Sequence, residues 1–141
     1  VPHVVHDANG GRSYLFYDVE RQLVGEVDAT GALVEYVRDT FGRIVQTVRY
    51  ATVLDTRAWM PAPPASPNLA QVPTDIALVR PTATPQDRTV TTFYDLLGRK
   101  TVETDGEGRV TYFSYDLNDR LIRTRQLPRV NAPQNEERIT R

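Results

Sequence analysis

Aspartates recur along this chain of 141 residues with a constant 21-residue period. The period separates three pairs: Asp7 and Asp28, Asp18 and Asp39, Asp95 and Asp116. A second aspartate lies near the middle of the period, as Asp18 does between Asp7 and Asp28. A period this short indicates that one small structural unit is repeated, and that neighbouring units stack on each other.

Most of these aspartates begin an Asp-x-x-Gly segment. One set comprises Asp7–Gly10, Asp28–Gly31 and Asp105–Gly108, and a second comprises Asp39–Gly42 and Asp95–Gly98. Asp18 and Asp116 fit the second set, with Arg21 and Asp119 in place of Gly. Asp at the first position of a turn accepts a hydrogen bond from the backbone two residues on, and Gly at the fourth tolerates a positive φ. We therefore expect a type I turn with a bulge at each segment.

The segments between the turns have the composition of strands. In Arg109–Tyr115 and in Arg88–Tyr94, apolar, aromatic and Thr residues alternate with a period of two. Such alternation, interrupted regularly by turns, is typical of an antiparallel meander. We predict an all-β fold in which seven or eight strands form hairpins.

The regular spacing is interrupted once, which divides the chain into four parts. Residues 1–50 form a first block of hairpins, 51–87 an insert, 88–127 a second block and 128–141 a tail or connector. The insert holds seven of the ten prolines and no Gly, so central strands are not expected there. It has room for one or two short helices, one starting at Ser66 and one within Thr74–Arg80.

We expect the insert to cross one face or one end of the sheet, with Trp59 and Met60 as its anchors. The alternative is a linker between two independent domains. That alternative is disfavoured because each block alone has only three or four strands, and small antiparallel sheets with a bare apolar face are marginal in isolation.

The repeat resembles the YD repeat of the Rhs family. The resemblance rests on Tyr94-Asp95-x-x-Gly98-Arg99, then Asp105-x-x-Gly108, then Tyr112-x-x-Tyr115-Asp116. The first block matches less well, with Tyr17-Asp18 followed by Arg21, and with Arg38-Asp39 in place of Tyr-Asp before Gly42-Arg43. The match covers about Asp7 to Tyr50 and Arg88 to Gln126.

The resemblance implies a function as well as a fold. Rhs proteins and related insecticidal toxin-complex proteins wrap YD-repeat sheets into a hollow shell around a toxin domain, and animal teneurins carry a similar shell. It therefore implies a structural wall segment of a bacterial shell, secreted or at the cell surface, with flanking repeats or other copies and a toxin domain as partners. This chain is too short for a closed shell and lacks the Asp-Pro-x-Gly motif that ends the shell core, so self-cleavage is not carried over.

Composition argues against most other classes. The chain has no Cys and a net charge of −1, which disfavours disulfide scaffolds, Cys-ligated zinc and nucleic-acid binding. No apolar run is long enough for a membrane span. Both histidines, His3 and His6, lie on an expected strand, where alternation places them on opposite faces. No Gly-x-Ser-x-Gly motif occurs. We expect no cofactor, no metal site and no enzymatic activity.

The sequence offers three further candidates: a calcium site, a set of arginine ion pairs and an aromatic binding surface. A calcium site at Asp116, Asn118 and Asp119 is disfavoured by its spacing. The recurrent Arg after each turn, and the basic stretch Arg120, Arg123, Arg125 and Arg129, are expected to form ion pairs, the latter with Glu103 and Glu107 across the hairpin. The alternative function is a glycan- or protein-binding module, which requires solvent-facing aromatic residues on one face, for example Tyr36, Trp59 and Tyr112.

Overall fold

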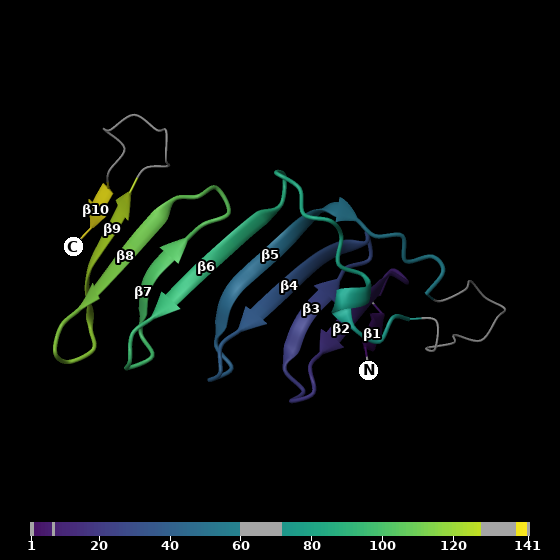
Figure 1. Ribbon diagram of the computed structural model, residues 1–141, viewed down its shortest axis with the longest axis horizontal. Helices are drawn as coiled ribbons and strands as arrows, with labels where there is room; N and C mark the ends of the chain where they lie inside the picture. Colours follow the sequence, from purple (N-terminus) through teal and green to yellow (C-terminus); the bar gives the residue numbers. More distant parts are fainter. Residues whose placement is uncertain (1, 7, 60–71, 128–137, 141) are drawn as a thin grey trace.

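The protein forms one open antiparallel sheet in which ten strands follow each other in chain order (Figure 1). The computed structural model describes residues 2–6, 8–59, 72–127 and 138–140. The strands are β1 (His3–His6), β2 (Arg12–Tyr17), β3 (Leu23–Val27), β4 (Ala32–Arg38), β5 (Ile44–Val53), β6 (Arg88–Tyr94), β7 (Lys100–Thr104), β8 (Val110–Tyr115), β9 (Leu121–Leu127) and β10 (Arg138–Thr140). The predicted all-β meander is confirmed. It has ten strands rather than the seven or eight expected, and the tail contributes the unexpected β10, which pairs with β9.

Successive turns lie at opposite ends of the strands (Figure 1). One end holds the turns of the second set, which join β2 to β3, β4 to β5, β6 to β7 and β8 to β9. We call this end the Tyr-Asp rim, made of residues 18–21, 39–42, 95–98 and 116–119. The turns 28–31 and 105–108 lie at the other end, the opposite rim.

The insert connects two strands of the same sheet. β5 pairs directly with β6 across it, with Gln46 opposite Thr91. The alternative of two independent domains joined by a linker is therefore wrong. Within 74–80 the chain forms one 3-10 turn, η2 (Ile76–Leu78), whose start is capped by the Asp75 side chain. The helix expected at Ser66 lies outside the described residues, as does Met60.

The described parts of the insert act as a strap over one face of the first block, and η2 lies in front of β2 and β3 in Figure 1. Trp59, Val72 and Ile76 are buried there against Tyr14 and Phe16. The Trp59 ring meets the Tyr14 ring edge-on, with 4.8 Å between their centroids. Such a ring pair adds to the free energy gained from burial alone. Trp59 is thus an anchor, as predicted.

Gly25 makes room for the strap. A Cβ at this position would lie 2.0 Å from Cδ1 of Ile76, so the missing side chain is what lets Ile76 pack onto β3. The repeat places Val102 at the equivalent position of the second block. Phe16 and its counterpart Phe93 show the same difference, since Phe16 is 1% exposed and Phe93 is 56% exposed. The strap therefore covers the first block and leaves this face of the second block open.

A polar contact fixes the end of the strap. Glu35 on β4 is almost buried, and its carboxylate accepts hydrogen bonds from the Arg80 guanidinium and from the Tyr50 hydroxyl. The bonds from Arg80, and then that from Tyr50, hold the pKa of Glu35 below its usual range despite its burial. Burial, followed by the neighbouring Glu35, raises the pKa of Tyr50 to about 12. The cluster is a partly buried ion pair that joins the strap to the sheet.

Candidate functional site

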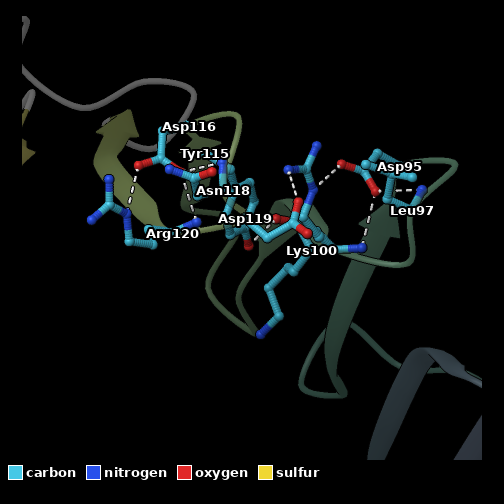
Figure 2. Close-up of polar contacts among 9 residues, drawn as sticks. Asp95, Leu97, Lys100, Tyr115, Asp116, Asn118, Asp119 and Arg120 are labelled. Atoms are coloured by element: carbon cyan, nitrogen blue, oxygen red, sulfur yellow. Dashed lines mark hydrogen bonds and ion pairs between the residues drawn. The ribbon is translucent and has the colours of Figure 1, made fainter.

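The Tyr-Asp rim is the candidate functional site, and each of its turns is built around an aspartate. In the turn 95–98, Oδ1 of Asp95 accepts hydrogen bonds from the backbone N–H of Leu97 at 2.9 Å and of Arg99 at 3.0 Å (Figure 2). The backbone N–H of Gly98 donates to the Asp95 carbonyl, which closes the turn. The same pair of side-chain bonds recurs at Asp18, Asp28, Asp39, Asp105 and Asp116.

The fourth position of each turn has a positive φ. The glycines there have φ between 79° and 90°, namely Gly10, Gly31, Gly42, Gly98 and Gly108. Arg21 and Asp119, which replace Gly in the second set, adopt the same left-handed conformation with φ of 63°. The turn geometry is therefore kept where Gly is missing, at a steric cost that is greater for Arg than for Asp. Asp7 lies outside the described residues.

The rim turns differ from those of the opposite rim in one respect. A β-bulge interrupts the register just before each rim turn, between Phe16 and Tyr17, Val37 and Arg38, Phe93 and Tyr94, and Ser114 and Tyr115. The pairing of β7 with β8, which are joined at the opposite rim, shows no such shift. The extra residue of each bulge lies on the strand that follows the turn, opposite the residue that precedes the aspartate.

In three rim turns, the arginine after the turn forms an ion pair with the aspartate that begins it. Nε of Arg43, Arg99 and Arg120 lies 2.8 Å from Oδ2 of Asp39, Asp95 and Asp116, respectively. The pKa of Asp95 is lowered chiefly by its bond from the Arg99 backbone, and that of Asp116 by the equivalent bond from Arg120. The predicted ion pairs of these post-turn arginines are therefore present, and each forms within its own turn.

The tyrosine before each of two aspartates bonds to the preceding rim turn. The Tyr115 hydroxyl donates to the Lys100 carbonyl at 2.7 Å, and the Tyr94 hydroxyl donates to the Ile44 carbonyl at 3.0 Å. In both cases the acceptor lies two residues after the positive-φ glycine of the preceding rim turn. Each Tyr-Asp pair therefore links two rim turns. Its Asp side chain stabilises the turn that it begins, and its Tyr hydroxyl bonds to the preceding rim turn.

The post-turn arginine also contacts that tyrosine. The Arg99 guanidinium lies 4.9 Å from the centre of the Tyr115 ring, and the Arg43 guanidinium lies 4.6 Å from that of Tyr94. These are cation–π contacts, which contribute modestly at exposed sites. Each arginine also forms an ion pair with the aspartate of its own turn. The contacts therefore run from that aspartate through the arginine to the tyrosine that precedes the next rim turn.

Arg38 occupies the tyrosine position of the weaker copy. Its Nε and Nη2 both donate to the Leu23 carbonyl, which again lies two residues after the left-handed residue, here Arg21. Its Nη1 donates to the Gly42 carbonyl at 2.8 Å. In residue type, Arg38 departs from the repeat, which has tyrosine at this position. The structure shows that it makes the same link by a different group.

A further ion pair joins the last two rim turns directly. Nη1 of Arg99 lies 2.7 Å from Oδ1 of Asp119, and Figure 2 shows Asp119 between the turns of Asp95 and Asp116. This arrangement bears on the calcium candidate, because the oxygens of Asp116 and Asp119 already accept from N–H donors. In the described part of the chain, no group of three or more metal-binding side chains comes together.

The three aromatic residues of the binding alternative are not brought together. Trp59 belongs to the strap and is buried against the first block, at 8% exposure. Tyr36 pairs with Thr47 and Tyr112 with Val102, and the register places these two tyrosines on opposite faces of the sheet. Tyr112 remains 42% exposed. The concave aromatic cluster that a binding module requires is therefore not formed by these residues.

His3 and His6 both lie on the exposed strand β1. Glu103 forms an ion pair with Lys100, and Glu107 forms one with Arg109. Arg129 of the basic stretch lies outside the described residues. No helix in the described ranges is long and apolar enough to cross a membrane.

Comparison with known proteins gives a likeness of fold. No protein-family model matches the sequence, and no curated protein matches it. The crystal structure of TcdB2-TccC3 without its hypervariable C-terminal region matches 99% of this chain with a TM-score of 0.57 and 12% sequence identity. A structure of TcdB2-TccC3-Cdc42 matches 96% of the chain with a TM-score of 0.37 and 13% identity. This chain spans 6% of the first structure's length and 9% of the second's. At these identities the first match shows that the chain shares the fold of a stretch of TcdB2-TccC3.

Proposed function

We propose that this chain is a wall segment of a bacterial Rhs-type, YD-repeat shell that encloses or presents a toxin domain, with no catalysis of its own. The observation that carries the proposal is the link from each of Tyr94 and Tyr115 to the carbonyl of the preceding rim turn. A unit of this kind makes its contacts with the unit before it, so it is complete only within an array.

The uses of the polar side chains support a structural role. The carboxylates of Asp39, Asp95 and Asp116 are taken up by their own turns, and the phenols of Tyr94 and Tyr115 by backbone carbonyls. Groups held in this way stiffen a sheet. A site that acts on a substrate would instead leave such groups available to bind it.

The fold match supports the same proposal. One stretch of a long wall is expected to match a small part of a complete shell protein along nearly all of its own length. This chain fits that expectation, since 99% of it matches and it covers 6% of the larger chain. The partners we propose are flanking repeats at the outer edges of β1 and β10, together with an enclosed toxin domain. The location that follows from such a role is secreted or at the cell surface, as part of a toxin-delivery protein.

The proposal is tested on the full-length protein that carries this chain. We expect its coding region to contain further units of the same period on at least one side of this chain. Electron microscopy of the purified protein should then show a hollow particle. A domain inside it should resist protease in native buffer and be cleaved once the wall is opened by mild denaturant. A gene without further repeats, or a particle without a cavity, contradicts the proposal.

A further inference from the structure

The tips of the Tyr-Asp rim are apolar and fully open to solvent. Five large apolar side chains of its four turns have exposed fractions between 71% and 106%; they are Val19, Phe41, Leu96, Leu97 and Leu117. The turns 28–31 and 105–108 of the opposite rim carry Ala29, Thr30, Gly106 and Glu107 at the same positions. The apolar tips are therefore a property of one rim and not of the turn type.

The arrangement of these tips is regular. Successive rim turns are two strands apart in the sheet order, so their tips follow each other at even intervals along its edge. Figure 1 shows the four turns in one row along the end of the sheet. Isolated exposed apolar residues need no explanation, but a row that recurs with the repeat marks an interaction surface.

The charges beside the tips indicate how the row can meet a partner. The turn 95–98 carries two leucines, and Asp95 and Arg99 cancel each other. On one side of it, Arg38 and Arg43 against Asp39 give one net positive charge. On the other side, Asp116 and Asp119 against Arg120 give one net negative charge, part of which faces Arg99 through its ion pair with Asp119. Each of the two flanking turns lies two strands away from the central one.

We infer that the Tyr-Asp rim binds the same rim of a second copy of this chain, around a two-fold axis through the turn 95–98. An isologous contact requires a surface that is complementary to itself. The axis places Leu96 and Leu97 against their own counterparts. It also places the positive turn 39–42, which carries Phe41, opposite the negative turn 116–119 of the second copy, which carries Leu117. By symmetry, the turn 116–119 of the first copy faces the turn 39–42 of the second.

The charge of the rim disfavours a membrane as the occupant. The first turn contributes Asp18, Glu20 and Arg21. Counted with the flanking Arg38, Arg43, Arg99 and Arg120, the four turns together carry one net negative charge. Loops that insert into anionic membranes combine apolar tips with an excess of basic residues. The inference does not depend on the proposed wall function, since it concerns only this chain and its rim.

The experiment uses single cysteines, because the natural chain has none. Leu96→Cys is expected to form a disulfide-linked homodimer under mild oxidation. Phe41→Cys and Leu117→Cys are each expected to crosslink little alone and at least fivefold more when the two proteins are mixed. Thr30→Cys, on an exposed turn of the opposite rim, is the control for random collision. Equal yields at all four positions, or a Phe41→Cys homodimer as abundant as the mixed product, overturn the inference.

Light scattering gives a second measurement on proteins without new cysteines. The unmodified chain should show a mass that rises toward a dimer with concentration. The triple variant Leu96→Ser, Leu97→Ser, Leu117→Ser should remain a monomer with an unchanged circular dichroism spectrum, because the side chains are solvent-exposed. A monomeric unmodified chain overturns the inference. Rim-dependent cosedimentation with phosphatidylcholine vesicles, with or without phosphatidylserine, overturns it in favour of a membrane.

Discussion

The Arg38 guanidinium reaches the Leu23 backbone carbonyl through both Nε, at 3.1 Å, and Nη2, at 3.0 Å. Tyr94 and Tyr115 contact the corresponding carbonyls of their own preceding turns through a hydroxyl. The contact is therefore retained where the residue type is not. Its acceptor is a backbone atom, so the repeat constrains the position of a donor more than the identity of a side chain.

Substitutions at Arg38 test this equivalence. We expect Arg38→Ala to lower the free energy of unfolding by about 1.5 kcal/mol, because a partly buried carbonyl loses a charged donor. Arg38→Tyr should recover most of that loss, since tyrosine is the residue that makes the link elsewhere. Urea unfolding followed by Trp59 fluorescence measures both variants. If Arg38→Tyr is as unstable as Arg38→Ala, the two residues are not equivalent here.

Tyr115 allows the hydrogen bond to be separated from the ring contact. Tyr115→Phe keeps the ring under the Arg99 guanidinium and removes the bond to the Lys100 carbonyl. We expect a loss of about 1 kcal/mol in unfolding free energy. Tyr115→Leu should lose more, because the cation–π contact is removed as well. Equal losses in the two variants would show that the ring contact contributes nothing measurable.

Gly25 and Ile76 should behave as a coupled pair. Gly25→Ala places a methyl group where Cδ1 of Ile76 lies. We therefore expect a loss of about 2 kcal/mol and a red shift of Trp59 emission as the strap loosens. The double variant Gly25→Ala, Ile76→Ala should be less destabilised than the sum of the two single variants. Strict additivity in denaturant unfolding would show that Gly25 is not there to receive Ile76.

The Glu35–Arg80 pair makes a prediction about pH. The pKa of Glu35 is lowered in the folded protein, so its contribution to stability is present above its unfolded value of 4.5 and is lost as the pH falls through its folded pKa. Arg80→Met should cost about 2 kcal/mol at pH 7, below the full value for a buried pair because Arg80 is partly exposed. Unfolding in urea at a series of pH values should show the deficit shrinking as the pH falls below 4.5 and through the lowered folded pKa of Glu35, because the carboxyl group is then protonated in both proteins.

An exposed pair provides the control for that measurement. Arg57 and Asp55 form an ion pair whose Arg side chain is 90% exposed. Arg57→Met should therefore leave the unfolding midpoint nearly unchanged at pH 7. A pH-dependent deficit of the same size in Arg57→Met would show that net charge, and not the Glu35 site, causes the effect.

The left-handed residues of the rim predict opposite effects of two substitutions. Arg21 has φ of 63° and Gly98 has φ of 79°. Arg21→Gly should raise the free energy of unfolding by about 1 kcal/mol by removing steric strain. Gly98→Ala introduces such strain and should lower it by about 1 kcal/mol. Thermal unfolding measures both, and a stabilising Gly98→Ala contradicts the proposed turn geometry.

The turns were predictable because they are local. Asp at the first position and Gly at the fourth determine a bend within four residues, and the constant period then indicates that the bends are equivalent. The role of Arg38 was not predictable, because its acceptor on Leu23 is distant in the chain and the repeat has tyrosine at that position. The strap was predicted through Trp59, but its seat at Gly25 was not, since a glycine within a strand carries no sign of its neighbour.

The last strand of the sheet was also missed, for a physical reason. Residues 138–140 have no turn signal of the repeat before them, so the tail gave no indication that β10 pairs with β9. The buried Glu35 could have been noticed, because it interrupts the apolar residues of β4. Its partner Arg80 lies far along the chain, in a segment without periodic structure.

The four bulges have a geometric consequence for any longer sheet of this kind. Each one increases the local twist and bends its strand. All four occur at the same place in the repeat, at the base of a rim turn, while the pairing of β4 with β5 has one further shift between Ala32 and Val34. The bends therefore have the same direction and add up along the sheet. Curvature increases by one step with every repeat, so the number of repeats sets how far such a sheet bends around the space beside it.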